Sequence, residues 1–452
     1  MSIRSQFPFF LLLVASRTAG FGQTTAQVVV KNQGFLPFAG APINYRSQDL
    51  DDPIARLQKR LDSGQAHLRF DAQRGYLKAV LEALRVPVNS QTLVFSKTSF
   101  QFPEIAPATP RALYYNDDVY VGQVHSGKFL EFVSFAPNQG AIFYVLDEHQ
   151  TEHPQFERAE VDCVQCHVAA STRNVPGVLM RSVFPKSSGY PAAGAHAFVT
   201  GHESPMNQRW GGWYVTAAHG ADGNMGNALV TDTKNPEQID RTAGAHTTNL
   251  AGHFKVEDYL TGSSDVVALM VLAHQTQMHN LITLTNYQTR LALFAAEKQG
   301  GELDRRKFEG PAEELVRYLL FTNEAPLESS VAGTSGFSAE FAARGLRDSR
   351  GRSLRDFDLR TRIFKYPCSY LVYSEDFDAI PEPAKSYIHR RMFEVLSGRD
   401  QSPAFAALKE ADRQAILEIL VATKPSLPVE WKHFIQQTST HSIRASAGVV
   451  NR

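Results

Sequence analysis

A cysteine–histidine motif constrains this chain more than any other feature of its sequence. Residues 163–167 read Cys-Val-Gln-Cys-His, so two of the three cysteines are separated by two residues and followed directly by a histidine. Such a motif can attach haem covalently, supply half of a zinc site or form a redox-active dithiol. A random order of this composition would contain about 0.0007 matches, which excludes coincidence.

Covalent haem attachment requires this arrangement of residues. Cys163 and Cys166 would form thioethers with the two haem vinyl groups, and His167 would become the proximal iron ligand. Only one such motif is present, so we expect one covalent haem c.

The other two chemistries lack part of their usual context. A zinc site would need two histidines beside the cysteines, but His196 and His202 are six residues apart and His219 stands alone. A thioredoxin-like dithiol follows a strand in a βαβ unit, whereas residues 152–162 predict no apolar strand. Zinc and the dithiol therefore remain the less favoured alternatives.

The ligand on the other side of the iron is left open by the sequence. Candidates downstream of the motif are Met180, His196, His202, Met206, His219 and Met225. Met225 lies in a glycine-rich stretch (GADGNMGNA), and a methionine ligand would raise the reduction potential. Its alternative role is to fill a gap in the core. Met225, His219 and His202 are our candidate distal ligands, with an open or water-filled position as the alternative.

Residues 265–298 predict one long helix that carries two histidines. His274 and His279 are five positions apart, so their side chains diverge by roughly 140° and cannot chelate one metal. Met270, His274 and Met278 share a face, which we expect to pack in the core; covering the haem is the alternative.

Two further stretches have an unusual composition. Residues 209–220 (RWGGWYVTAAHG) predict a strand whose backbone is approached closely by other parts of the chain. Its tryptophans either line a porphyrin site or belong to an ordinary aromatic core. Residues 344–362 are rich in arginine and aspartate; we expect a mutually paired surface loop, with an anion or haem-propionate clamp as the alternative.

The N-terminus is typical of an exported protein. Arg4 precedes the apolar run 7–15, and Gly20 and Gly22 offer a cleavage site, so residues 1–22 predict a signal peptide. The run is too short to cross a membrane, so we expect no membrane span in the mature chain. With three cysteines in 452 residues the chain is no disulfide scaffold, and Cys368 is expected to be a buried, inert thiol.

Charge excludes one class of partner. Lys plus Arg equals Asp plus Glu at 46 each and the pI is near 7.3, so no basic field exists to bind nucleic acid.

Hydrophobic patterning predicts an α+β protein with a β-rich N-terminal half, an irregular haem-binding middle and a helical C-terminal half. Short aromatic and β-branched runs within residues 91–147 predict an antiparallel sheet, with a turn at 138–140. The other expected boundaries are a helix starting at Asp52-Pro53, a helix over 71–86, a helix ending at Gly398 and a last helix opening at Pro403. The expected regions are a signal peptide (1–22), a β-rich part with two short helices (23–150), a haem c-binding part (151–255) and a helical part (256–440), which together form one continuous unit.

These motifs carry a resemblance to a known class of proteins. CVQCH resembles the attachment motif of c-type cytochromes, and the order PRALYYNDDVYVG, CxxCH, RWGGWYVT, YPCSYLVYSEDFDAIP is similar to large secreted bacterial cytochrome c domain-containing proteins of uncharacterised function. The similarity covers about residues 45–430. It implies a periplasmic or secreted location, a haem on Cys163 and Cys166 with His167 as axial ligand, and one-electron transfer with a redox partner protein.

We therefore expect an exported monohaem c-type cytochrome. One alternative is a peroxidase-like haem enzyme with an open distal site, in which His202, His219 or an arginine would act as acid or base. A second alternative is a haem-containing ligand-binding or sensor module. The sequence assigns no catalytic residue.

Overall fold

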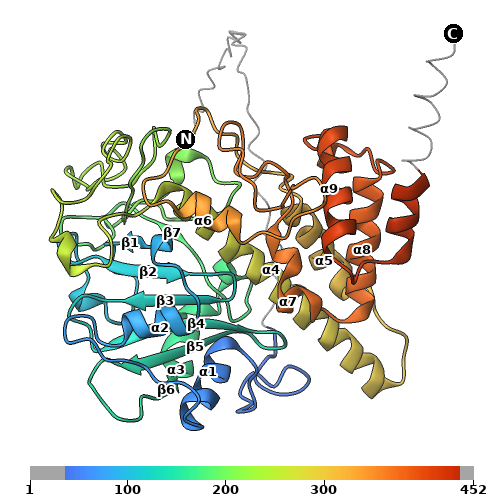
Figure 1. Cartoon of the computed structure of the whole chain (residues 1–452), viewed down its shortest axis with the longest axis horizontal. Coiled ribbons are helices and arrows are strands. Elements are labelled where there is room, and N and C mark those ends of the chain that lie inside the picture. Colours follow the sequence, from blue (N-terminus) through green and yellow to red (C-terminus); the bar gives the residue numbers. More distant parts are fainter. Residues whose placement is uncertain (1–35, 438–452) are drawn as a thin grey trace, which may run out of the picture. The chain divides into compact units, whose positions relative to one another are not determined.

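The N-terminal half is built on a seven-stranded sheet (Figure 1). The strand order is β6-β5-β4-β3-β2-β1-β9, and every pairing is antiparallel. The strands are β1 (Thr92–Val94), β2 (Arg111–Tyr115), β3 (Val119–Gln123), β4 (Phe129–Ala136), β5 (Gly140–Asp147), β6 (Phe156–Arg158) and β9 (Trp213–Tyr214). The computed structural model describes residues 36–437, so the signal peptide expected at 1–22 lies outside the described residues.

Alternating side chains give this sheet two apolar faces. In β5, Ala141 and Phe143 point to one hydrophobic cluster, whereas Ile142 and Tyr144 point to another. The first cluster continues into the long helix α4 (Val266–Gln299). The second includes the apolar faces of α1 (Pro53–Asp62) and α2 (Leu77–Ala83). The sheet is therefore buried on both faces.

The expected start of the first helix is confirmed. Asp52 is the N-cap of α1, its Oδ1 accepts the amides of Ile54 and Ala55 at 2.9 and 3.3 Å, and Pro53 takes the first helical position. Tyr144 of β5 donates to the other oxygen of Asp52 at 2.7 Å, which fixes the helix to the sheet. The helix expected at 71–86 is shorter, because residues 71–75 form a turn around the Asp71 carboxylate.

The C-terminal half is helical, so the predicted α+β class is confirmed. Besides α4 it contains α5 (Arg306–Leu319), α6 (Phe337–Ala343), α7 (Glu375–Asp378), α8 (Glu382–Leu396) and α9 (Glu410–Thr423), with residues 429–437 also helical. In Figure 1, α4 passes from the sheet toward α5, α8 and α9, and the first hydrophobic cluster is continuous across all of them. Gly398 follows α8 with a φ of 76°, as its place after the helix predicts.

The predicted start of the last helix is wrong. Pro403 opens only a single 3₁₀ turn, Pro403–Phe405, and α9 begins at Glu410. The intervening backbone is held by a side chain instead of by helical hydrogen bonds. The buried guanidinium of Arg413 donates to the carbonyls of Phe405 and Leu408 at 2.8 and 2.9 Å.

Arg413 also donates to the carbonyls of Val395 and Asp400, at 2.6 and 2.8 Å. A lysine ammonium cannot reach four carbonyls spread around a planar fork. Arg413→Lys is therefore expected to lower the free energy of unfolding by about 2–4 kcal/mol. Urea titration checks this, with Arg390→Lys as the control at an exposed position of α8; equal effects of the two substitutions would contradict the role given to Arg413.

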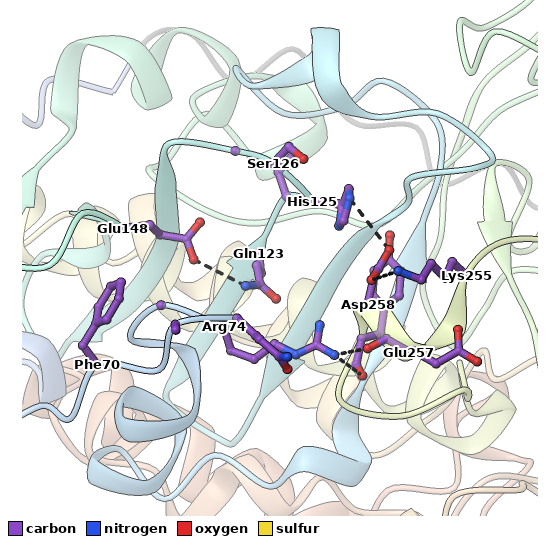
Figure 2. A pocket seen from close by; sticks show the side chains of 15 residues that line it. Phe70, Arg74, Gln123, His125, Ser126, Glu148, Lys255, Glu257 and Asp258 are labelled. Atoms are coloured by element: carbon purple, nitrogen blue, oxygen red, sulfur yellow. Dashed lines mark hydrogen bonds and ion pairs between the residues drawn. The ribbon is translucent and has the colours of Figure 1, made fainter.

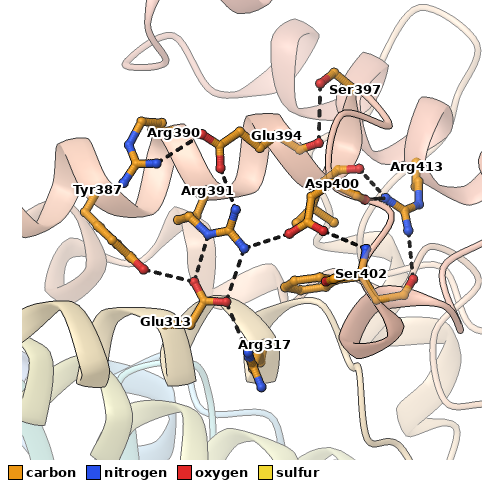
Figure 3. Close-up of polar contacts among 12 residues, drawn as sticks. Glu313, Arg317, Tyr387, Arg390, Arg391, Glu394, Ser397, Asp400, Ser402 and Arg413 are labelled. Atoms are coloured by element: carbon orange, nitrogen blue, oxygen red, sulfur yellow. Dashed lines mark hydrogen bonds and ion pairs between the residues drawn. The ribbon is translucent and has the colours of Figure 1, made fainter.

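An ion-pair network joins α5 to α8 (Figure 3). Arg391 of α8 donates to Glu313 of α5 at 2.9 Å and to Asp400 at 2.8 Å, and it also pairs with Glu394. Burial alone would raise the pKa of Asp400, but the hydrogen bonds from Arg391 and the Ser402 amide lower it to about 2. Asp400 therefore contributes to this network only while its carboxylate is ionised.

This network predicts a specific loss of stability in acid. Because the pKa of Asp400 falls from 3.8 to about 2 on folding, its contribution is fully present above 3.8 and is lost as the pH drops toward 2. Arg391→Gln should lower the melting temperature at pH 7. Between pH 3.8 and about 2, the melting temperature of this variant should fall less steeply than that of the wild type. Arg306→Gln, at an exposed pair with Asp304, should change neither. If the melting temperatures of the two variants changed with pH in the same way, this account would be wrong.

The region expected to be irregular contains little regular structure. Its elements are β6, α3 (Glu160–His167), the two-residue strands β7 (Arg181–Ser182) and β8 (Phe198–Val199), β9 and two short 3₁₀ turns. The expected close backbone contact in the tryptophan-rich stretch is present. A Cβ at Gly211 would collide with the Val183 carbonyl, and one at Gly212 would collide with Ser96. Trp210 and Trp213 lie in the core cluster.

Candidate functional site

The cysteine–histidine motif forms its own short helix, α3, which follows the edge strand β6. Residues 152–162 predict no apolar strand before the motif, but a short, mostly polar strand is present there, because Phe156–Arg158 pairs with β5. This strand is hard to predict because only Phe156 of its three residues is buried. The pairing is antiparallel, so the motif still does not stand in a βαβ unit.

The three motif side chains share one face of α3. Cys163, Cys166 and His167 occupy positions i, i+3 and i+4, which neighbour one another on a helix. Cys166 is exposed, whereas Cys163 is half-buried and packs against the hydrophobic cluster on the α4 side of the sheet. Glu160 fixes the first turn of the helix by an ion pair of 2.8 Å with Arg46.

The ring of His167 is held in one orientation. Its Nδ1 lies 2.8 Å from the carbonyl oxygen of Gly177, and the ring packs at 4.8 Å from that of Phe143 in β5. A carbonyl only accepts, so Nδ1 carries the proton and Nε2 keeps its lone pair. Burial lowers the pKa of His167, although the Gly177 carbonyl opposes this effect. The imidazole is therefore neutral at pH 7, the form that binds a metal ion.

The loop after the motif folds back onto the helix end. The Gly177 amide donates to the His167 carbonyl at 3.0 Å. The Thr172 hydroxyl lies 3.1 Å from the same carbonyl and 3.0 Å from that of Val175. These contacts make residues 168–177 a closed turn that presents the Gly177 carbonyl to the imidazole.

Met225, the first candidate distal ligand, lies in a separate hydrophobic cluster. It is fully buried with Phe184, Ala192 and Val230, and the Ser182 hydroxyl lies 3.5 Å from its sulfur. This environment matches the gap-filling role. A bond between its sulfur and iron stays a prediction.

His202, the second candidate, is engaged with a histidine of α4. Its Nδ1 lies 2.8 Å from Nδ1 of His274, whose Nε2 lies 2.8 Å from the Ser369 hydroxyl. The rings of Tyr318 and Phe321 stack on His202 at 4.0 and 4.5 Å. Burial lowers the pKa of both histidines, that of His274 to about 3, so both are neutral. The expected core role of His274 is thus confirmed.

The remaining candidates lie in different surroundings. His219 is exposed, and its Nδ1 donates to the Ser330 carbonyl at 2.7 Å, which leaves Nε2 with a lone pair as in His167. His196 is exposed and pairs with Glu237, Met180 is buried in the core and Met206 is half-buried beside it. The structure brings Cys163, Cys166 and His167 together, and the distal ligand stays a prediction.

The second α4 histidine points elsewhere, as the helix geometry predicts. His279 donates from Nε2 to the Asp117 carbonyl at 2.9 Å and stacks on Phe135 of β4 at 3.7 Å. It therefore packs against the sheet, whereas His274 faces His202.

The arginine-rich loop is paired, but the expected pairing within the loop is only part of it, because several of its arginines bond to other elements. Arg352 bonds to Asp348 and Glu418 at 2.7 and 2.6 Å, and Arg362 bonds to Asp412 at 2.8 Å. Burial raises the pKa of Cys368 well above its usual range, which agrees with the inert thiol expected there.

A polar cavity of 590 Å³ opens beside the sheet at a distance along the chain from the motif (Figure 2). Its walls come from residues 70, 72–75, 123–127, 255 and 257–259, together with Glu148. Burial raises the pKa of Glu148 to about 7, and Gln123 donates to its carboxyl at 3.4 Å. No candidate site residue lines this cavity. Sequence patterns did not reveal it because it is assembled from separate segments.

No family model, no curated protein and no solved structure matches the chain. Within residues 36–437, no group of three or more His, Cys, Asp or Glu side chains is placed to hold a metal ion. Over the same residues, no helix combines the length and apolar character needed to cross a membrane.

Proposed function

We propose that this protein is an exported monohaem c-type cytochrome that transfers single electrons. Cys163 and Cys166 would carry the haem as thioethers, and His167 would be its axial ligand. The observation that supports this most is the hydrogen bond from His167 Nδ1 to the Gly177 carbonyl. It leaves Nε2 as the ligand atom, in the manner of metal-binding histidines.

The residues present fit a covalent haem by their chemistry. Two thiols and a neutral imidazole share one helix face, and the exposed thiol of Cys166 is accessible for thioether formation. When bound, the haem would supply a reversible one-electron couple. The chain's own contribution would be to fix the ligand tautomer through Gly177 and to restrict the imidazole ring against Phe143.

A second candidate function follows from the surroundings of the candidate distal ligands. Met225 packs in a hydrophobic cluster of its own and His202 is engaged with His274, which favours an iron with an open position. Such a site would suit a peroxidase-like enzyme or a ligand-binding module. The exposed His219, with its Nε2 lone pair, would then be the accessible acid–base group.

The optical spectrum of the reduced protein separates these functions. A carrier with six ligands should keep its spectrum under carbon monoxide, and a methionine–iron band in the oxidised form would assign a methionine such as Met225. Rapid spectral change on adding carbon monoxide would reject the six-coordinate carrier and support the open site. His219→Ala should abolish peroxide turnover if the second function is correct and change nothing if the first is.

A further inference from the structure

A buried asparagine of α4 holds the loop that carries the Gly177 carbonyl. Asn280 is fully buried, its Nδ2 donates to the Val178 carbonyl at 2.7 Å and its Oδ1 accepts the Val178 amide at 3.0 Å. One side chain thus satisfies both backbone groups of the residue that follows Gly177. Because buried backbone groups need partners, the loop has a strong preference for this position.

The packing between Asn280 and the loop leaves no spare room. A Cβ on Gly177 would collide with Oδ1 of Asn280 and press against Thr172, so only glycine fits between the helix and the loop. The Gly177 amide also donates to the His167 carbonyl at 3.0 Å. The side chain of Asn280, two residues of backbone and the ring of His167 therefore form one continuous chain of contacts.

We propose that Asn280 is a positioning residue for the imidazole of His167. By fixing Val178 it fixes the Gly177 carbonyl, and that carbonyl keeps the proton on Nδ1 and the lone pair on Nε2. The helix that carries Asn280 has 34 residues, nearly all of them buried in its first three-quarters, so it is a rigid support. Asn280, in the helical C-terminal half, thereby sets the orientation of His167, in the N-terminal half.

The role in iron ligation rests on the proposed cytochrome function, but the control of the His167 tautomer does not. A carbonyl acceptor on Nδ1 makes an imidazole more basic and favours the oxidised metal. Loss of Asn280 should weaken that hydrogen bond, shift the proton toward Nε2 in the haem-free chain and raise the midpoint potential of the haem-loaded chain.

The test compares two buried asparagines of the same helix. Asn280→Ala removes the bonds to Val178, whereas Asn286→Ala removes matching bonds to the carbonyls of Pro137 and Ala379, at 3.3 and 3.2 Å. Nitrogen NMR of the full-length haem-free chain reports the His167 tautomer, assigned from a His167→Gln spectrum. We expect Nδ1–H in the wild type and in Asn286→Ala, and a shift toward Nε2–H in Asn280→Ala.

The haem-loaded chains give the second readout, in which only Asn280→Ala should have a raised midpoint potential. An unchanged tautomer and potential in a folded Asn280→Ala variant would overturn the proposal. Should that variant fail to fold, Asn280→Asp keeps the volume, replaces the donor that faces the Val178 carbonyl with a carboxyl oxygen and is read by the same two measurements. If the wild type carries no covalent haem, the cytochrome proposal fails while the tautomer measurement still decides the role of Asn280.

Discussion

Chains in which Cys163 and Cys166 are both replaced by alanine are expected to fold but to lose all covalently bound haem. Thioether formation requires the two thiols, and nothing else in the proposed site bonds covalently to the haem. The cost to the fold should be small, because Cys166 is exposed, Cys163 is half-buried and alanine favours a helix. Haem-dependent peroxidase staining after denaturing electrophoresis measures the loss.

The third cysteine provides the matched control for this experiment. Cys368 is fully buried and lies outside the motif, so Cys368→Ala should keep the haem stain while lowering stability by about 1 kcal/mol through a small cavity. Single replacement of Cys163 or Cys166 should leave one thioether. Retention of the stain in the double variant would remove the two cysteines from the site.

The largest expected effect on stability comes from one buried carboxylate at the start of α4. Asp265 is the N-cap of that helix, and its Oδ1 accepts the amides of Val267 and Ala268 at 2.8 and 3.2 Å. Its Oδ2 accepts the amides of Thr334 and Ser335 at 2.6 and 2.8 Å. The single side chain therefore caps the central helix and also anchors the loop before α6.

Asp265→Ala should lower the free energy of unfolding by about 3–5 kcal/mol, because it removes a cap and leaves buried amides without partners. Asp265→Asn keeps the shape of the side chain, but its NH₂ group would face some of these amides. The free energy of unfolding of this variant should therefore lie between those of the wild type and the alanine variant. Urea unfolding followed by circular dichroism gives the values. Asp304→Ala, at a half-exposed position just before α5, is the control, and an equal loss there would show that Asp265 has no special role.

Local sequence signals predict the regular elements of this fold well. The Asp52-Pro53 start, the long helix after residue 265 and the antiparallel strands of residues 91–147 all follow from capping residues and periodicity, and all are present. The wrong boundaries have tertiary causes. Strand β6 depends on pairing with β5 rather than on an apolar run, and α9 starts late because Arg413 takes the carbonyls before it.

For the candidate site, the sequence predicts the grouping of the three motif side chains, and the haem that they would carry stays a prediction. Cys163, Cys166 and His167 can be found from the sequence because they lie within five consecutive residues, which form about one turn of a helix. The contact between Asn280 and Val178 joins positions 102 residues apart, so no local pattern contains it. For the same reason the pairing of His202 with His274 could not be predicted from either segment.

Mass spectrometry of one peptide tests the central claim most directly. The full-length chain is produced in a host that matures a known c-type cytochrome in the same cells, and the purified protein is denatured and digested with trypsin. We predict that the peptide spanning residues 159–173, which holds both motif cysteines, carries the mass of one haem. An unmodified peptide from cells in which the known cytochrome is fully loaded would contradict the account.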